Sequence, residues 1–354
     1  MNLDKVQQKI VNAEENKILV IAGSGSGKTR VLTERIKKLL NDNVDPTKIV
    51  AITFTNAAAA EMRERLGEIA QDVFIGTIHS YANRLLLIGG IDTSKYIEDE
   101  KFDRLFDEVR RNLTTFPEVH HLLVDEFQDI DDNQYEFFQL LNPQNYFYIG
   151  DDYQNIYAWR GANIEHFYEL YEDDETTVYM MANNYRTARE IIKYASTFIS
   201  KIKNTIIKRV RCLQENGDVI HLKTFDKDFI INYIIGDKKY GEWFILTRTN
   251  SQINLMLNLL KSKNIPCDTF KKSELDNEEL KNRLKENTVK ILTVHSAKGL
   301  ENEKVVVIGV KPYSEDECRV AYVAATRAKR LLIWVHSLKD PNKNNLKSNI
   351  ENWE

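Results

Sequence analysis

A glycine-rich segment near the start of the chain has the residue types needed to hold phosphate groups. It follows an apolar run at 18–22, precedes a helical pattern at 30–40, and reads Gly23-Ser24-Gly25-Ser26-Gly27-Lys28-Thr29. Glycines let backbone N–H groups turn towards an anion, and the following helix N-terminus adds positive potential. Lys28 would then reach the β and γ phosphates, and the Thr29 hydroxyl would bind magnesium. The segment predicts a site for ATP and Mg²⁺.

One position departs from the strict phosphate-loop pattern GxxxxGK[ST]. The pattern has glycine where this chain has Ala22. A plain glycine-rich connecting loop is therefore the alternative interpretation. The apolar run before the segment and the helical pattern after it favour the phosphate loop, with Ala22 to Thr29 as its binding residues.

A pair of acidic residues supplies the second part that phosphoryl transfer needs. Asp125 and Glu126 directly follow the apolar run 122–124. Asp125 would hold magnesium through water, and Glu126 would polarise the attacking water as general base. An acidic pair alone more often marks a solvated turn. The phosphate loop upstream favours the catalytic interpretation, because the two motifs complete each other.

Short apolar runs alternate with helical patterns along the whole chain, which predicts an α/β fold. The helical patterns include 187–200 and 251–263. The predicted strands are 18–22, 49–54, 73–76, 122–124 and 146–149 in the first half, and 243–247, 289–293, 305–308 and 331–335 in the second. Two parallel sheets imply two domains, 1–170 and 171–340, followed by a polar tail at 341–354. The changeover is placed in the acidic stretch 165–177.

The composition mainly excludes certain kinds of site and classes of protein. The 354 residues carry 49 Lys plus Arg against 53 Asp plus Glu, so the chain lacks the overall basic charge of many nucleic-acid binders, which counts against DNA binding. A motor that releases its track at each step can nevertheless work with a locally basic groove. The widely spaced Cys212, Cys267 and Cys318 suggest neither a disulfide framework nor a zinc site. No apolar run reaches the roughly 18 residues that cross a membrane, and the N-terminus lacks a signal or transit pattern. These features predict a cytoplasmic protein without a membrane partner.

Several ordered segments resemble the UvrD/Rep/PcrA helicases of superfamily 1, and together they span the whole chain. They read LDKVQQKIV, AGSGSGKTRVLTERI, TFTNAAAAEMRERL, GTIHSYANRLL, VDEFQDIDDNQ, IGDDYQNIYAWRGA, NNYRTAREI, ILTVHSAKGLENEKVVVIG and RVAYVAATRAKRLL. The resemblance implies two RecA-like domains, each a parallel sheet flanked by helices, with ATP in the cleft between them. It also implies an ATP-dependent translocase or helicase on single-stranded DNA, moving 3′ to 5′.

Carried over by position, the resemblance assigns contacts to the nucleoside part of ATP. Gln7 would read the adenine edge, Arg30 would pack near the base, and Tyr185 would stack on it. Gly299 and Glu301 are assigned to the same nucleotide, with Glu301 near the ribose.

The resemblance also assigns three residues to the γ phosphate. Gln154 would sense it, and Arg186 and Arg327 would reach it from the second domain. Guanidinium groups supplied across a cleft stabilise charge on the transferring phosphoryl group, so they tie hydrolysis to closure. For Arg327 taken alone, a surface arginine on a helix is the alternative.

The family's DNA-contacting segments give seven candidate contacts to single-stranded DNA. They are Thr55, Asn56, His79, Tyr157, Trp159, Arg160 and His295. Base stacking on aromatic side chains is sequence-tolerant, as a motor without sequence preference requires. Core packing is the alternative for the two aromatics. A plain hydrogen-bonding role is the alternative for the two histidines, and no metal is implied.

Departures from the family pattern bear on what the motor can do. Ala57 stands where the family usually has Lys, and Asn302 stands where Phe is typical. Only about forty residues separate Arg84 from Asp125, and about a hundred separate Arg186 from Ile291, so the accessory insertions are reduced. Translocation needs only the two core domains, whereas unwinding of a tailed duplex depends more on those insertions.

Two other functions remain open at this point. One is a nucleotide-switched recombination or repair mediator that binds DNA and does not walk. The other is an ATPase that acts on protein partners. A general base at Glu126 and two γ-phosphate arginines argue against the first, and the YAWRGA and TVHSAKGLE segments argue against the second. A monomer is expected, with a loader or a repair or replication protein as a possible partner.

Overall fold

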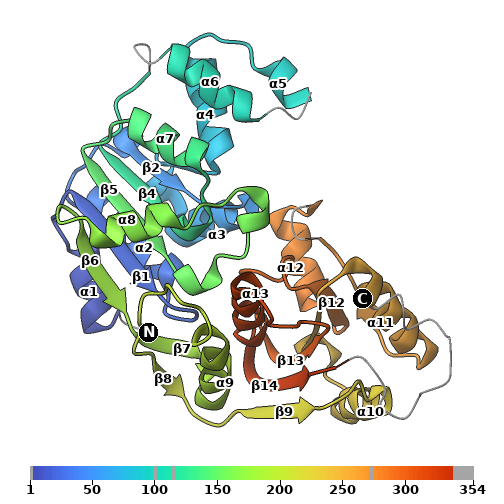
Figure 1. The fold of residues 1–354 in the computed structure, drawn as a ribbon. Helices are drawn as coiled ribbons and strands as arrows, with labels where there is room; N and C mark the ends of the chain where they lie inside the picture. The colour runs from blue at the N-terminus through green and yellow to red at the C-terminus, as the bar shows by residue number, and fades with distance from the viewer. Residues whose placement is uncertain (1–2, 99–101, 113–115, 272–273, 338–354) are drawn as a thin grey trace. The chain divides into compact units, whose positions relative to one another are not determined.

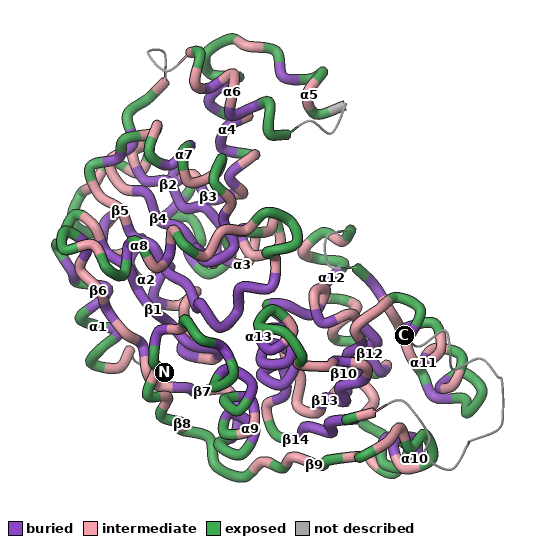
Figure 2. Tube along the Cα trace, viewed as in Figure 1, coloured by how far each residue is buried: buried purple, intermediate pink, exposed green. Residues whose placement is uncertain are grey.

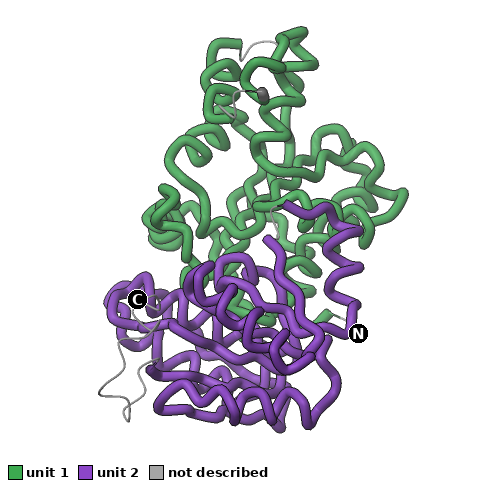
Figure 3. The backbone as a smooth tube through the Cα atoms, turned by 90° about the vertical axis from the view of Figure 1, so that its right-hand side faces the viewer, with its two compact units in different colours: residues 1–182 green, residues 183–354 purple. Residues whose placement is uncertain are grey.

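The computed structural model describes residues 3–98, 102–112, 116–271 and 274–337. The predicted polar tail at 341–354 lies outside these residues. The chain divides into two compact units, Met1–Ala182 and Asn183–Glu354, which Figure 3 shows in separate colours. Each unit has its own parallel sheet and its own core, as the sequence predicts.

Unit 1 is built on a six-stranded parallel sheet with the order β3-β2-β4-β5-β1-β6. Its strands are β1 Lys17–Ala22, β2 Ile49–Ile52, β3 Phe74–Gly76, β4 His121–Val124, β5 Asn145–Gly150 and β6 Thr177–Met181. Its helices are α1 Lys5–Val11, α2 Lys28–Asn41, α3 Asn56–Leu66, α4 Ile78–Ile88, α5 Ser94–Glu98, α6 Asp103–Arg111, α7 Asp132–Leu140 and α8 Glu165–Glu172. Helices α1 to α3, labelled in Figure 1, share one hydrophobic cluster with the sheet, and the central strands are buried (Figure 2).

The first sheet extends further along the chain than the sequence indicates. Strand β6 pairs with β1 in parallel, with Ile18 opposite Thr177 and Ala22 opposite Met181. Its hydrogen bonds tie it to unit 1, so the division falls at 182/183 and not at 170/171. The acidic stretch expected to link the domains instead contains α8 and leads into this strand.

Unit 2 contains a second six-stranded parallel sheet with the order β11-β12-β10-β13-β14-β9, and a parallel pair, β7-β8. Its strands are β7 Asn183–Ala188, β8 Arg211–Gln214, β9 Asp218–Leu222, β10 Trp243–Thr247, β11 Cys267–Asp268, β12 Val289–Thr293, β13 Asn302–Ile308 and β14 Ala328–Val335. Its helices are α9 Arg189–Ile199, α10 Lys227–Asp237, α11 Asn250–Ser262, α12 Asn277–Lys285 and α13 Glu315–Ala325.

The predicted strands are confirmed where the strand is apolar and buried. Strand β10, for example, begins and ends where the sequence indicates and is buried at every position. The missed strands are peripheral: β8 is mostly exposed, and β9, at the edge of the sheet, is partly exposed. An edge strand needs no continuous apolar run, so periodicity does not reveal it. Among the described helices, none has the length and apolar character needed to cross a membrane.

The centre of the second sheet sets the stability of unit 2. Ile245 on β10 is fully buried and lies between Ile291 of β12 and Val306 of β13. We expect Ile245→Ala to lower the free energy of unfolding by about 2–5 kcal/mol, because it removes apolar contacts and leaves a cavity. Urea unfolding followed by tryptophan fluorescence would measure this, since Trp243 and Trp334 are buried in the same unit.

Ile207→Ala is the matched control, because Ile207 in unit 2 is 80% exposed. It should change the free energy of unfolding by no more than about 0.5 kcal/mol. Equal effects of the two substitutions would contradict the placement of Ile245 in the core.

Candidate functional site

The phosphate loop lies between the end of β1 and the start of α2, which begins at Lys28. Gly25 and Gly27 have φ values of 70° and 90°, in the left-handed region that favours glycine. The Ser26 hydroxyl is buried and has no hydrogen-bond partner within the described part of the chain. A buried polar atom without a partner costs free energy, so this loop is built to meet a polar ligand.

Gln7, on helix α1, forms a hydrogen bond with the phosphate loop. Its amide nitrogen donates to the Ser26 carbonyl at 3.0 Å, and its amide oxygen accepts from the Asp4 backbone N–H at 3.0 Å. A Cβ on Gly27 would lie 3.1 Å from the same amide nitrogen. The structure therefore places Gln7 against the loop, while its contact with adenine stays a prediction, as does that of Arg30 on α2.

The acidic pair follows β4, and Glu126 lies beside Lys28 of the phosphate loop. Asp125 is 8% exposed, and its carboxylate accepts from the Glu126 N–H at 2.9 Å. Glu126 has a φ of 51°, a conformation that costs a non-glycine residue about 1–3 kcal/mol and often marks a functional site. Its Oε1 lies 3.6 Å from the Lys28 Nζ. The fold thus brings together the two sequence-predicted charges that catalysis requires.

Gln128 is a residue of the candidate site that sequence reasoning missed. It is fully buried, its amide nitrogen donates to the Glu126 Oε2 at 2.6 Å, and its amide oxygen accepts from the Asp151 N–H at 2.9 Å. A Cβ on Gly150 would lie 2.5 Å from that amide oxygen, so the close approach requires glycine. Gln128 orients the Glu126 carboxylate. Its place between acidic residues in VDEFQD was the available signal.

A chain of hydrogen bonds continues from Gln128 to the predicted γ-phosphate sensor. The Asp151 carboxylate accepts from the Gln154 amide at 2.6 Å, and both residues are buried. Glu126, Gln128, Asp151 and Gln154 are therefore linked one to the next inside unit 1. A displacement of Gln154 would therefore be transmitted through these hydrogen bonds to Glu126, the proposed general base.

The residues present around this loop fit a magnesium nucleotide. The glycine-rich turn leads directly into a helix N-terminus, Ser26 offers a buried hydroxyl without a partner among the described residues, and Lys28 lies beside the Glu126 carboxylate. Thr29, in the first turn of α2, and Asp125 are the candidate metal ligands. No part of this arrangement conflicts with a bound triphosphate.

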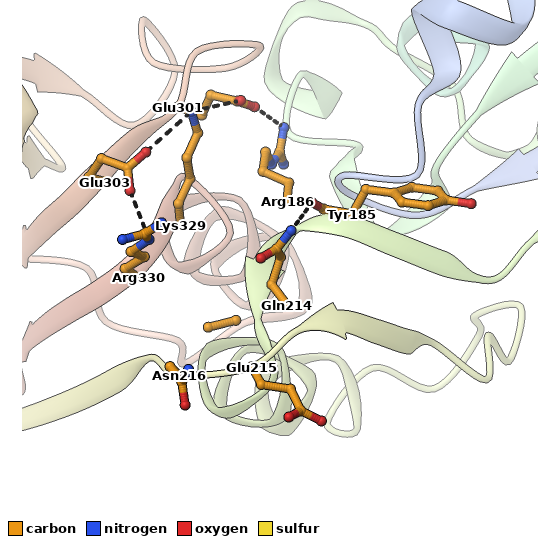
Figure 4. A pocket seen from close by; sticks show the side chains of 10 residues that line it. Tyr185, Arg186, Gln214, Glu215, Asn216, Glu301, Glu303, Lys329 and Arg330 are labelled. Atoms are coloured by element: carbon orange, nitrogen blue, oxygen red, sulfur yellow. Dashed lines mark hydrogen bonds and ion pairs between the residues drawn. The ribbon is translucent and has the colours of Figure 1, made fainter. Parts of the chain in front are cut away.

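In unit 2, Tyr185, Arg186 and Glu301 line one pocket of about 520 Å³, which Figure 4 shows from close by. The Arg186 Nη1 lies 2.5 Å from the Glu301 Oε2, and its Nη2 donates to the Thr326 carbonyl at 3.2 Å. Burial alone would raise the pKa of Glu301, but the positive charges of Arg186 and Lys329 outweigh it and lower the pKa. Glu301 is therefore a carboxylate at neutral pH.

Arg327 is only 2% exposed, so the surface-arginine alternative is wrong. Its Nε donates to the Val323 carbonyl at 3.1 Å and its Nη1 to the Leu300 carbonyl at 3.1 Å. Gly299, in the turn just before, has a φ of 81° and is exposed. The fold brings Arg327 next to the segment that carries Glu301, but its reach to a γ phosphate stays a prediction.

An aromatic cluster in unit 1 matches the predicted DNA contacts. Tyr157 stacks on Phe54 with ring centroids 5.0 Å apart and an interplanar angle of 20°. The Arg160 guanidinium lies 5.6 Å from the Trp159 ring, and Trp159 is 70% exposed, so the core alternative is wrong for Trp159. Sequence reasoning missed Phe54, although its place in TFTN, as an exposed aromatic after a buried strand, was a signal.

The remaining predicted contacts have structural roles in unit 1. The Thr55 hydroxyl caps α3 by accepting from the Ala58 N–H at 3.2 Å, and Asn56 is the exposed first residue of that helix. His79 stacks on Phe106 with centroids 5.0 Å apart. Burial lowers the pKa of His79 more than nearby Asp103 raises it, so the imidazole is neutral at pH 7. None of these contacts tests DNA binding.

Unit 2 holds the other predicted DNA contact and one departure from the family pattern. His295 lies half-buried in the turn between β12 and β13. Asn302, which replaces the usual Phe, donates from its side-chain amide to the Gly241 carbonyl at 2.9 Å. This hydrogen bond fixes the start of β13.

The fold and the site define a class first. Two parallel α/β units, a phosphate loop after the first strand and an acidic pair after the fourth identify a P-loop nucleotide hydrolase of the RecA-like kind. Sequence profiles then specify the family. The UvrD/REP helicase N-terminal domain matches residues 3–88 and 101–175, and the UvrD-like helicase C-terminal domain matches 179–275 and 268–338. The chain belongs to the UvrD/REP helicase family.

Individual relatives agree with this family. A probable DNA helicase of Mycoplasma pneumoniae is 27% identical over 94% of this chain and 83% of its own length. The ATP-dependent DNA helicases PcrA of Staphylococcus epidermidis and Leuconostoc citreum are 27% and 28% identical, each over 75% of this chain. The chain spans about half the length of these PcrA relatives. The class predicted from the sequence, an ATP-dependent DNA helicase, is the class of this family.

The backbone of the phosphate loop gives a prediction about nucleotide binding. Gly27→Ala would place a side chain at a φ of 90° and 3.1 Å from the Gln7 amide, at a cost of about 1–3 kcal/mol. We expect affinity for a fluorescent ATP analogue, measured by titration, to fall about tenfold or more.

Gly236→Ala is the control, because nothing lies within 4 Å of a Cβ at that position in α10. Its nucleotide affinity should equal that of the wild type. Unchanged affinity in Gly27→Ala, with a normal circular dichroism spectrum, would show that this loop does not hold the phosphates.

Proposed function

We propose that the chain is an ATP-driven translocase on single-stranded DNA that moves 3′ to 5′ and couples hydrolysis to strand movement. One observation carries the proposal: the hydrogen-bond chain from Glu126 through Gln128 and Asp151 ends at Gln154. The same short segment continues into Tyr157, Trp159 and Arg160. The chemistry and the DNA-contacting aromatics are therefore joined by covalent and hydrogen-bonded links within one unit.

In the proposed reaction, unit 1 holds and attacks the γ phosphate. Lys28 and the loop N–H groups bind the phosphate oxygens, while Glu126 accepts a proton from the attacking water. Gln128 holds the Glu126 carboxylate in the required orientation, since its amide lies 2.6 Å away. Magnesium, held by Thr29 and Asp125, would neutralise charge on the β and γ phosphates.

Residues of unit 2 are proposed to act on the same nucleotide. Arg186 and Arg327 would stabilise charge on the transferring phosphoryl group, which makes turnover depend on closure of the two units. Tyr185 would stack on the base that Gln7 and Arg30 approach, and Glu301 would bind the ribose near Gly299. Opening after hydrolysis would shift affinity for the strand between units and give directed movement.

Strand binding is proposed to rest mainly on stacking. Trp159 offers an exposed ring, and Phe54 and Tyr157 form a stacked pair beside it. Burial raises the pKa of Tyr157, so its ring stays uncharged at neutral pH. Thr55, Asn56, His79, Arg160 and His295 are the proposed polar contacts. Such a surface binds bases without reading their identity.

Unwinding is a separate part of the proposal. Because the accessory insertions are reduced, we propose that movement along the strand is stronger than separation of a duplex. The protein would act in the cytoplasm as a monomer on single-stranded DNA or a tailed duplex, with a loader or a repair or replication protein as partner. Rates of translocation and unwinding on one tailed duplex would separate the two activities.

A nucleotide-switched mediator that does not walk is the rival function. Such a switch gains nothing from a general base that is itself held in place. Glu126 adopts a strained backbone conformation and accepts a hydrogen bond from the buried Gln128 amide. A protein that does not hydrolyse ATP would have no use for a carboxylate held in place at this cost. The family also favours the helicase.

ATP turnover tests the proposed function. We expect single-stranded DNA to stimulate turnover strongly, and Lys28→Ala and Arg186→Ala to lower kcat by about 10³. Arg327→Ala should lower it similarly, with circular dichroism as a check because Arg327 is buried. Glu126→Gln should lose turnover and keep DNA binding.

Lys37→Ala is the matched control for Lys28, since Lys37 lies on the same helix in an ion pair with Glu34. It should hydrolyse ATP at the wild-type rate. Turnover that single-stranded DNA does not stimulate would refute the motor and favour an ATPase acting on other partners.

DNA affinity tests the aromatic cluster. Trp159→Ala should weaken binding of a labelled oligothymidylate by about 1–3 kcal/mol, because one stacked base loses its platform. Fluorescence anisotropy without nucleotide would measure this, with Tyr171→Ala as the control, an aromatic 42% exposed on α8. A change of less than about twofold for Trp159→Ala would remove Trp159 from the DNA path.

A further inference from the structure

The pocket in unit 2 contains more charged groups than the predicted nucleotide contacts account for. Its lining residues come from β7, β8, β13, β14 and the segments beside them, and Figure 4 shows their side chains. Its lining includes Tyr185, Arg186, Gln214, Glu301, Glu303 and Lys329. A volume of about 520 Å³ suits a ligand of nucleoside size. Lys329 has no role in the proposed function so far.

Lys329 reaches the carboxylate that is proposed to bind the ribose. Its Nζ lies 3.3 Å from the Glu301 Oε1 and 3.7 Å from the Glu303 Oε1. The other oxygen of Glu301 faces Arg186 at 2.5 Å. Glu301 therefore lies between two cations, one at each oxygen.

An irregularity in the pairing of β13 with β14 places Lys329 beside the Glu301 carboxylate. Asn302 pairs with Ala328, whereas Lys304 pairs with Leu331, so Lys329 and Arg330 together stand opposite Glu303. This is the arrangement of a β-bulge, which re-aims side chains and often lies beside functional sites. At the bulge, the Lys329 side chain points towards Glu301, while the Arg330 Nε lies 3.3 Å from the Glu303 Oε2.

The two cations at Glu301 differ in what the proposed reaction asks of them. Arg186 is proposed to contact the γ phosphate, and it would then be drawn away from Glu301. A half-buried carboxylate that loses its counter-ion is harder to keep charged and in place. Lys329 would remain, because its neighbours are Glu301 and Glu303.

We propose that Lys329 is a positioning residue that holds the Glu301 carboxylate for the ribose hydroxyls of ATP. It acts through Glu301 and touches no reacting atom. This inference rests on the proposed function, because it requires ATP at this pocket. It assigns the discrimination between nucleotides with and without ribose hydroxyls to the Lys329–Glu301 pair.

The test compares ATP with 2′,3′-dideoxy-ATP in DNA-stimulated turnover by the full chain. The wild type should show a lower KM for ATP than for the dideoxy nucleotide. Lys329→Ala should raise the KM for ATP about tenfold and leave the KM for dideoxy-ATP nearly unchanged, since that nucleotide has no hydroxyl for Glu301 to bind. The kcat values should stay within about twofold, because the γ-phosphate contacts are intact.

Three variants make the result specific. Lys329→Arg should restore the preference for ATP, because a guanidinium can span the same gap. Arg330→Ala removes a positive charge from the same bulge, but its partner is Glu303, so it should change both KM values by one common factor. Lys271→Ala breaks an exposed ion pair outside the pocket, with Glu274, and should change neither value.

Each alternative outcome has a definite meaning. Equal increases in both KM values for Lys329→Ala would overturn the proposal and indicate a direct contact between Lys329 and the phosphates. A wild type that does not distinguish the two nucleotides would also overturn it while leaving the proposed motor intact. Turnover of neither nucleotide would instead count against the proposed function. Fluorescence of buried Trp334, on the same strand, verifies that the variants are folded.

Discussion

In unit 1, one carboxylate is held beside a lysine, and the proposed chemistry depends on this contact. The Glu126 carboxylate lies 3.6 Å from Lys28 and receives the Gln128 amide on its other oxygen. Each partner comes from a different part of the sheet's edge: Lys28 starts the helix after β1, and Gln128 follows β4. Parallel strand order brings these edges together, since β1 and β4 both flank β5. The strand order of unit 1 therefore places the lysine next to the carboxylate.

The same principle operates in unit 2 with more charges. Glu301 is held between Arg186 and Lys329, and Arg327 is anchored on backbone carbonyls close by. Burial would raise the pKa of Glu301, so its ionised state depends on these cations. Each unit therefore carries a glutamate whose orientation is set by its own neighbours. Proposed contacts to ATP build on these two prepared carboxylates.

The sequence predicted those parts of the fold in which one local pattern decides the outcome. Strand β10 is a continuous apolar run with the length of a buried strand, and the phosphate loop is a glycine pattern with a fixed context. By contrast, β6 carries a mixed burial pattern, so the domain boundary was placed too early. Gln128 and Lys329 escaped notice for a different reason. Their roles come from partners brought close by strand pairing and by a bulge, and spacing along the chain does not encode these.

The contact between Gly150 and Gln128 has a consequence for how this protein can vary. A methyl group at position 150 would overlap the Gln128 amide oxygen. The amide would turn, and the carboxylate it supports would turn with it, although Gly150 is not one of the residues predicted to bind phosphate or magnesium. Substitutions at position 150 are therefore expected to be selected against, both in evolution and in laboratory selection for stability. Only the hydrogen atom of glycine leaves room there for the Gln128 amide.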